Sequence, residues 1–183
     1  MIPIYIIGGV LVALIAFLAV YYNRFIQLTN KVQSAWSDID THLKKRYDLI
    51  PNLLNIIKGY AAHEQNTLER VVELRNLAQR AEGTQNQAEA ETMLTGALKS
   101  LFALSEAYPD LKANTNFLDL QDTLKEVEDE INMARRYYNG SVKNYNTTIQ
   151  MFPANLLAQL FGFKDADFFE AKIGERENVS TEF

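Results

Sequence analysis

The 183-residue sequence contains no cysteine, and its first 23 residues carry no charged side chain. Without cysteine the chain cannot form disulfides, thiolate metal sites or a cysteine nucleophile. Glycine and proline are also scarce, with eight and four residues in the whole chain. Because these residues punctuate turns, their scarcity favours long helices over a sheet of many short strands. The composition therefore predicts an all-α protein.

The uncharged N-terminal stretch is almost wholly apolar from Ile4 to Tyr22. About 20 apolar residues in a helix span the hydrocarbon core of a bilayer, which is roughly 30 Å thick. A cleaved signal peptide would begin with a basic region and would have a shorter apolar core. No Lys or Arg precedes this apolar run, and it ends in Tyr21 and Tyr22. We therefore expect residues 1–23 to form an uncleaved transmembrane anchor that contacts the lipid bilayer through residues 4–22.

The cations nearest to the anchor follow it, at Arg24 and Lys31. Since Lys and Arg resist translocation, the anchor is expected to cross the membrane once, with its N-terminus outside and the remaining chain in the cytoplasm. The formal net charge of -5 argues against a general nucleic-acid binder, which needs a basic surface to displace counterions. We expect no nucleic-acid partner.

Apolar residues recur three or four apart from Phe25 onward, which predicts amphipathic helices. The expected helices cover residues 24–81, 87–106, 115–151 and, as a short segment, 153–161. The first would continue the anchor without interruption. Pro51 lies inside it, where a proline removes one backbone hydrogen bond. Two readings of Pro51 stay open, namely a kink near residues 47–51 or a true break with Pro51 in the first turn of a new helix.

The helical segments predict an antiparallel helical bundle over residues 24–163. The segment 115–151 has the strict three-four alternation of a coiled-coil-like seam in a left-handed bundle. Asn114 or Thr115 is the expected cap at its start. Residues 164–183 are polar and acidic, and we expect this tail to be largely disordered. The expected first helix is much longer than the second, so its exposed apolar stripe favours self-association into a homo-oligomer.

Three motifs identify a resemblance to a known family. They are AWSDIDTHLKKRYDLIPNLLNIIKGYAAHE (35–64), YPDLKANTNFLDLQDTLKEVEDEI (108–131) and RRYYNGSVKNYNTTIQMFP (135–153). In this order they resemble the LemA family of bacterial membrane proteins, from the anchor to about residue 169. The resemblance implies a single-pass protein of the bacterial inner membrane with a LemA-like cytoplasmic helical bundle. It implies no settled reaction. Roles suggested for the family are membrane remodelling and work alongside membrane-protein partners such as a protease.

Catalytic and metal-binding patterns are absent from the sequence. His63 and Glu64 begin a zinc-protease motif, but the second His would fall at position 67, which is Thr67. There is no Gly-rich phosphate loop and no nucleophile elbow. We therefore expect no enzyme activity, no metal and no cofactor.

Two sets of residues are candidate interaction sites. Asn132, Asn139 and Asn146 are spaced by seven beside the apolar seam of segment 115–151. At a boundary between helices they would fix register or receive a partner, as buried asparagines do in coiled coils, and otherwise they form a solvated ladder. The second set is the apolar segment after Pro153, with Leu156, Leu160, Phe161 and Phe163. It either packs back over the end of the bundle or binds lipid or a partner.

The sequence as a whole predicts a membrane-anchored helical-bundle scaffold or adaptor that self-associates and has no catalytic activity. A membrane-remodelling oligomeric assembly is the alternative. A metal-dependent hydrolase is the third hypothesis, which a tightly bound metal in the purified protein would support.

Overall fold

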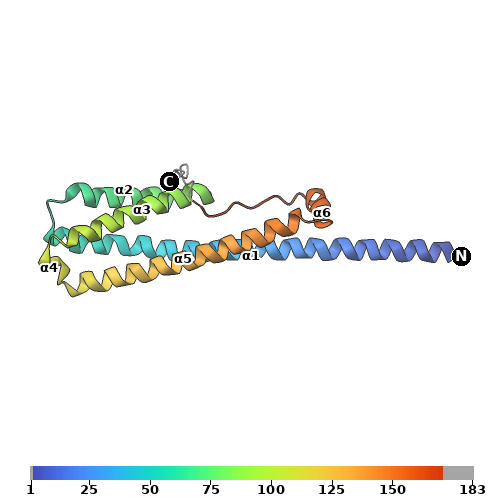
Figure 1. Cartoon of the computed structure of the whole chain (residues 1–183), viewed down its shortest axis with the longest axis horizontal. Coiled ribbons are helices and arrows are strands. Elements are labelled where there is room, and N and C mark those ends of the chain that lie inside the picture. Colours follow the sequence, from blue (N-terminus) through green and yellow to red (C-terminus); the bar gives the residue numbers. More distant parts are fainter. Residues whose placement is uncertain (1, 171–183) are drawn as a thin grey trace, which may run out of the picture. The chain divides into compact units, whose positions relative to one another are not determined.

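The computed structural model describes residues 2–170 of the chain, with side chains from residue 6 onward. The elements are α1 (Ile2–Tyr60), α2 (Gln65–Arg80), α3 (Thr84–Ser105), α4 (Pro109–Lys112), α5 (Thr115–Gln150) and α6 (Ala154–Phe161), as Figure 1 shows. Within the described residues every regular element is a helix. The prediction of an all-α protein, with an N-terminal apolar helix that continues into a bundle of long antiparallel helices, is confirmed.

The predicted helix over residues 24–81 is wrong in one respect, because the structure divides it into two. α1 ends at Tyr60, and α2 begins at Gln65 after a short turn. Folding back lets α2 bury Leu68, Val71, Leu74 and Ala78, a stripe that a straight helix would leave without a partner. The other predicted helices lie within three residues of α3, α5 and α6.

Pro51 lies inside α1 and does not end it. A proline at this position has no N–H to donate to the carbonyl of Tyr47, four residues earlier. The freed carbonyl accepts instead from Arg75 on α2, whose Nε lies 2.7 Å from the Tyr47 oxygen. This contact satisfies the acceptor that the proline leaves open and also fixes α2 against α1.

The chain divides into two compact units. One comprises residues 1–43 and 130–167, and the other comprises residues 44–129 and 168–183. Each unit is described separately below.

The second unit contains the end of α1, then α2, α3, α4 and the first part of α5, each long segment antiparallel to the one before it (Figure 1). Its large, fully buried apolar side chains include Ile50, Leu53, Ile57, Leu94, Leu101, Leu111 and Phe117. Asn114 caps α5, because its Oδ1 accepts from the backbone N–H of Phe117 at 3.0 Å. The predicted cap at Asn114 is thus confirmed.

The first unit contains most of α1, the second part of α5, and α6. The aromatic rings of Trp36 and Tyr138 lie 5.5 Å apart, and His42 Nδ1 lies 3.2 Å from a Glu130 oxygen. As residue numbers rise along α1 their partners on α5 fall, so the two helices are antiparallel. A hydrophobic cluster joins α1, α5 and α6. Its buried members are Phe25, Leu28, Tyr145, Ile149, Ala154 and Ala158.

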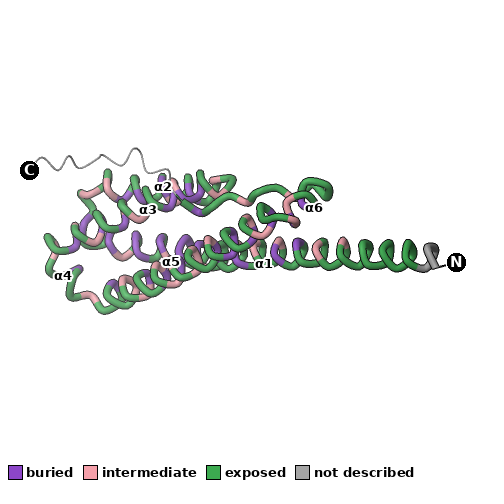
Figure 2. Tube along the Cα trace, turned by 45° about the vertical axis from the view of Figure 1, so that its right-hand side comes forward, coloured by how far each residue is buried: buried purple, intermediate pink, exposed green. Residues whose placement is uncertain are grey.

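The N-terminal part of α1 has a different environment. It has a mean hydropathy of 2.2 over an 18-residue window of which no residue is buried, so it is long and apolar enough to cross a membrane. Figure 2 shows this part of α1 as exposed, in contrast to the buried residues of the bundle. A core helix of similar composition would be mostly buried. The N-terminal apolar helix therefore indicates membrane anchoring.

The contact between Arg75 and Tyr47 generates a first prediction. Arg75→Met should lower the free energy of unfolding by about 1.5–3 kcal/mol, because it removes a charge-assisted hydrogen bond. In a Pro51→Ala background the loss should be much smaller, since the amide of residue 51 can then donate to the Tyr47 carbonyl. Chemical denaturation of the full-length protein in detergent, followed by circular dichroism, measures both values.

Arg70→Met is the matched control, because Arg70 lies on the same helix and its ion pair with Glu73 is exposed. It should cost less than about 1 kcal/mol in either background. An equal cost of Arg75→Met with and without Pro51 would contradict the compensation.

Candidate functional site

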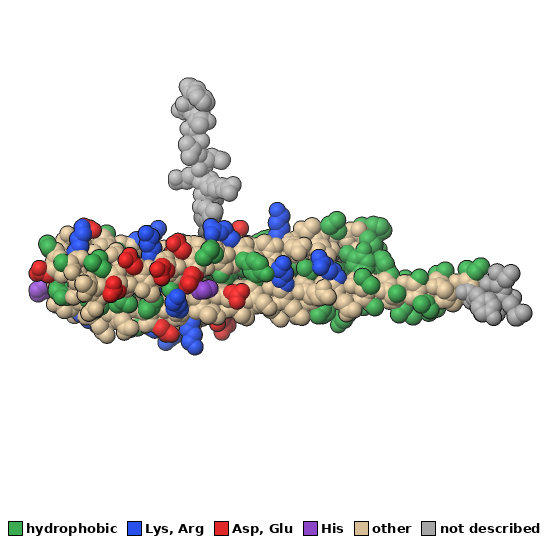
Figure 3. Space-filling model, turned by 90° about the horizontal axis from the view of Figure 1, so that it is seen from below, with side chains coloured by type: hydrophobic (Ala, Val, Ile, Leu, Met, Phe, Trp, Pro, Cys, Tyr) green, Lys and Arg blue, Asp and Glu red, His purple; other side chains and the backbone are tan. Residues whose placement is uncertain are grey.

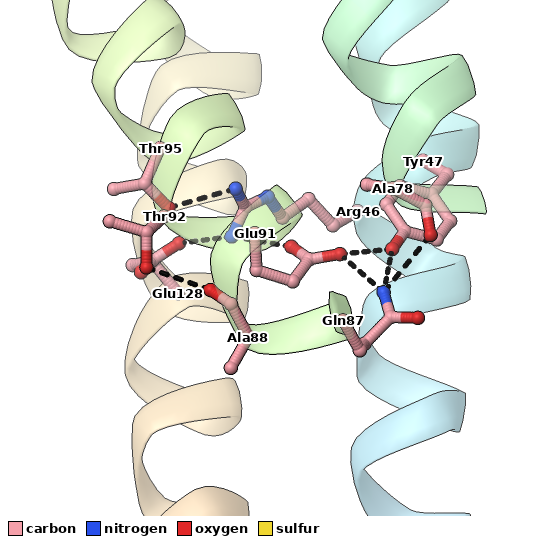
Figure 4. Close-up of polar contacts among 9 residues, drawn as sticks. All are labelled: Arg46, Tyr47, Ala78, Gln87, Ala88, Glu91, Thr92, Thr95 and Glu128. Carbon is pink, nitrogen blue, oxygen red and sulfur yellow. Dashed lines mark hydrogen bonds and ion pairs between the residues drawn. The ribbon is translucent and has the colours of Figure 1, made fainter. Parts of the chain in front are cut away.

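The most unusual chemical feature of the second unit is a buried arginine. Arg46, on α1, is 1% exposed. Its Nη1 lies 2.6 Å from Oε2 of Glu128 on α5 and 3.5 Å from Oε2 of Glu91 on α3. Its Nη2 donates to Oγ1 of Thr95 at 2.9 Å, and Figure 4 shows these contacts. One guanidinium therefore connects three helices.

A second group of polar contacts adjoins the arginine. The hydroxyl of Tyr47 donates to Oε1 of Glu91, and Nε2 of Gln87 lies 3.0 Å from the same oxygen. The Gln87 amide also lies 2.9 Å from the Tyr47 hydroxyl oxygen and 3.1 Å from the carbonyl of Ala78 on α2 (Figure 4). Together, Arg46, Tyr47, Gln87, Glu91 and Glu128 form a polar cluster that joins α1, α2, α3 and α5.

The electrostatics of the polar cluster follow from two carboxylates that share one guanidinium. Burial raises the pKa of Glu91, and the attraction of Arg46 offsets this only in part. Glu128 is closer to Arg46 and is about one third exposed, so it is the better solvated of the two acids. Burial also raises the pKa of Tyr47, with the charge of Glu91 adding to the effect. The phenol therefore stays protonated and acts as a hydrogen-bond donor.

The polar cluster has the features of a structural core rather than of a reaction site. A pocket of about 230 Å³ lies beside Arg46, lined among others by Leu98, Phe102 and Leu124. Ligand pockets are typically about 300–1,000 Å³, so this one is small. Most polar atoms of the cluster pair with one another, although Nε of Arg46 and Oε2 of Glu91 are buried without a hydrogen-bond partner. The described residues contain no group of three or more potential metal ligands. The arrangement can hold helices in register, but it presents no activated nucleophile to a substrate.

The structure places the three predicted asparagines on α5, where all three are half-buried. Asn146 binds the chain's own C-terminal segment. Its Nδ2 donates to the carbonyl of Ala166 and its Oδ1 accepts from the N–H of Ala166, both at 2.9 Å. Its side chain thereby pairs with one residue of extended backbone. A role in helix register would have required a partner on another helix. The partner of Asn146 is instead the backbone of Ala166, outside the helices.

Neighbouring side chains of α5 hold the same segment. The hydroxyls of Tyr138 and Tyr145 donate to the carbonyls of Asp167 and Lys164, at 2.9 and 2.8 Å. Burial raises the pKa of both tyrosines, which keeps them protonated as donors. The expectation of a disordered tail is therefore wrong for residues 164–167, which are hydrogen-bonded. The part of that tail from residue 171 to 183 lies outside the described residues.

The apolar segment after α5 presents several of its large side chains outward, while Leu157 and Phe163 pack against the hydrophobic cluster. Phe152 is 79% exposed, Leu160 is 71% exposed and Leu156 is 57% exposed. We call the exposed set Met151, Phe152, Leu156, Leu160 and Phe161 the α6 surface. The buried residues of α6 are the small side chains Ala154 and Ala158. α6 thus packs on the bundle through Ala154, Leu157 and Ala158 and leaves Leu156 and Leu160 exposed. Binding of lipid or a partner by this segment stays a prediction.

Aromatic contacts fix α6 beside the anchor. The ring of Phe161 lies 5.2 Å from that of Tyr22, the last residue of the apolar run. The ring of Phe163 lies 5.1 Å from that of Phe25 and 6.1 Å from that of Tyr22. Figure 3 shows hydrophobic side chains gathered next to the N-terminal segment of α1. The α6 surface is therefore located where the chain emerges from the predicted membrane span.

Sequence reasoning missed the acidic partners of Arg46. The sequence analysis singled out neither Glu128 nor Glu91. A signal was nevertheless present, because Gln87, Glu91, Leu94, Leu98 and Leu101 follow one another at spacings of three and four. Two polar residues on the apolar stripe of a helix indicate a buried polar contact.

Comparison with known proteins agrees with this architecture. The LemA family model matches residues 35–183. The chain is 27% identical to magnetosome protein MamQ 2 of Paramagnetospirillum magneticum, over 88% of this chain and 69% of that protein. It is 28% identical to Protein LemA of Metamycoplasma hominis, over 87% and 73% of the two chains. MamQ of Magnetospirillum gryphiswaldense is 26% identical, over 88% and 69%.

The fold and the two sites define a helical-bundle protein with an apolar N-terminal helix suited to membrane anchoring. The match covers most of the sequence, and the chain belongs to the LemA family. The resemblance found in the sequence motifs is thereby confirmed.

The polar cluster generates a prediction that depends on pH. Arg46→Met leaves Glu91 buried without its cation, so it should destabilise the full-length protein by about 3–5 kcal/mol at pH 7. Because the pKa of folded Glu91 is raised, its favourable contribution is complete below the unfolded value of about 4.3 and is lost as pH rises through the folded value. Loss of Arg46 raises that folded value further. Thermal unfolding should therefore show the variant losing more stability than the wild type between pH 5 and pH 8.

The control is the double variant Arg46→Met/Glu91→Gln, which removes the carboxyl group as well. It should recover part of the lost stability at pH 8 and lose the added pH dependence. A single variant with the same deficit at both pH values would show that Glu91 is not the uncompensated charge.

Proposed function

We propose that this protein is a non-enzymatic scaffold or adaptor, held in the bacterial inner membrane by residues 4–22 and self-associating there. The observation that carries the proposal is the contrast within α1. Its N-terminal part is apolar and wholly exposed, while the same helix further on is locked into the polar cluster through Arg46 and Tyr47.

Exposed apolar side chains on the bundle support self-association. Val72 and Leu77 on α2 are exposed, as are Met133 and Tyr137 on α5. Exposed apolar groups mark contacts between proteins where they form a contiguous patch. We propose a second copy of this chain as the first partner, with other proteins of the same membrane, such as a protease, as further partners.

A membrane-remodelling assembly is the second candidate function, and the α6 surface favours it. Large apolar side chains beside an anchor would displace lipid in one leaflet, and self-association would concentrate that effect. Two relatives are named magnetosome proteins. Liposomes deformed by the purified protein alone would distinguish this candidate from a simple adaptor.

Self-association predicts a discrete mass. Full-length protein in nanodiscs, measured by multi-angle light scattering with the lipid contribution subtracted, should contain more than one copy. The matched control begins at Asn23 and lacks the anchor. If the anchor contributes to assembly, the control should be smaller in copy number, and monomers in both samples would contradict self-association.

The proposed orientation predicts a pattern of chemical labelling. The natural chain has no cysteine, so single introduced cysteines can be read without background. Ser100→Cys, at an exposed position on α3, should resist a membrane-impermeant maleimide in intact cells and react in inverted vesicles. A cysteine added ahead of Met1 should show the reverse. Labelling of position 100 in intact cells would overturn the cytoplasmic assignment.

A further inference from the structure

α6 departs in part from the arrangement expected for a helix in water. An amphipathic helix of a soluble domain places its large apolar side chains against the core and its small or polar ones outside. Here Ala154 and Ala158 are buried and Leu157 is half-buried against the hydrophobic cluster, while Leu156 and Leu160 are exposed. The helix also lacks charge, since residues 151–163 contain no Asp, Glu, Lys or Arg. Its outer face is therefore unsuited to water.

The contacts of α6 with α1 determine how deep α6 would lie in the membrane. Tyr22 ends the apolar run, and tyrosine is typical of the boundary between lipid tails and water. The ring of Phe161 lies against Tyr22, and that of Phe163 lies against Phe25, less than one helical turn further on. An anchor that spans the bilayer would therefore hold α6 at the level of the lipid headgroups. Exposed Ile26 continues the apolar surface from the anchor along α1.

We propose that α6 is an interfacial membrane helix, with Phe152, Leu156 and Leu160 inserted among the lipids of the cytoplasmic leaflet. The inference rests on the anchoring part of the proposed function and assigns it a second membrane contact. A helix of this kind lies in the plane of the interface with its apolar face about 5–10 Å below the headgroups. Ala154 and Ala158 then form the attachment to the bundle, and the aromatic contacts with α1 prevent the helix from leaving the surface.

The charges around α6 indicate which kind of lipid surface it fits. Arg24 and Lys164 are exposed near it, and so is Asp165, whereas Asp167 lies further from the anchor, where its carbonyl binds Tyr138. Because the net charge of the three near groups is small, attraction to anionic headgroups contributes little and insertion of apolar side chains provides the main contribution. The helix should therefore insert into a bilayer of zwitterionic phosphatidylcholine alone.

Spin labelling of the full-length protein in phosphatidylcholine nanodiscs tests the proposal. Leu160→Cys carries the nitroxide label, and Leu156→Cys serves as a second position should one variant fold poorly. Both native side chains are exposed, so little packing is lost. Ser34→Cys is the matched control in water, because it is exposed on α1 about 18 Å beyond Tyr22. Val12→Cys, within the predicted span, is the reference in lipid.

The measured quantity is collision with oxygen, which concentrates in lipid, relative to collision with a water-soluble nickel chelate. A ratio at position 160 several-fold above that at position 34, and approaching that at position 12, is the expected result. A ratio equal to that at position 34 would overturn the proposal. Low collision rates with both reagents, together with dipolar broadening between labels, would also overturn it and would assign the α6 surface to a second copy.

The reference position separates this inference from the proposed function. If position 12 is in lipid and position 160 is in water, the anchor stands and only the interfacial role of α6 fails. If position 12 itself collides with the nickel chelate, the anchoring on which both proposals rest fails.

Discussion

A buried guanidinium constrains the second unit more than any other group. Taking a charge out of water costs several kcal/mol unless partners in the protein replace its hydration. Arg46 obtains its partners from α3 and α5 at once, through Thr95, Glu91 and Glu128. Removal of either α3 or α5 would deprive the charge of one of its two carboxylates. The arginine thus makes the helices of this unit depend on one another, in a way that apolar packing alone does not enforce.

Tyr47 extends this dependence to α2. Its hydroxyl donates to Glu91, and its carbonyl accepts from Arg75 because Pro51 cannot supply the helical N–H. A proline in the middle of a long helix is normally a defect. Here it creates an acceptor that only a side chain from a neighbouring helix can satisfy. The position of the proline and the position of the arginine on α2 are therefore parts of one arrangement, and neither can be explained from α1 alone.

Features that depend on neighbouring residues could be predicted from the sequence, whereas contacts between residues far apart in the chain could not. The ends of α5 and the cap at Asn114 depend on neighbouring residues, and local pattern was sufficient to find them. The turn between Tyr60 and Gln65 contains no Gly or Pro, so only the weakening of the apolar stripe marked it. Asn146 pairs with Ala166, which lies 20 residues later in the extended segment after α6. The acidic composition of that segment did not indicate the contact. Likewise, no local rule states that Glu91 lies opposite Arg46.

Burial of apolar side chains stabilises both units, but the large side chains near α6 are buried only in part. The hydrophobic cluster around Phe25 and Ile149 demonstrates that large side chains near α6 are readily buried. Leu156 and Leu160 belong to the same segment and are nevertheless outside the cluster, while Ala154, Leu157 and Ala158 lie on the inner face of α6. Leucines that stay exposed to water forgo the contribution of about 1.5–3 kcal/mol that burial of each would give. An apolar medium outside α6 would recover that contribution, and the contact of Phe161 with Tyr22 places α6 beside the apolar part of α1.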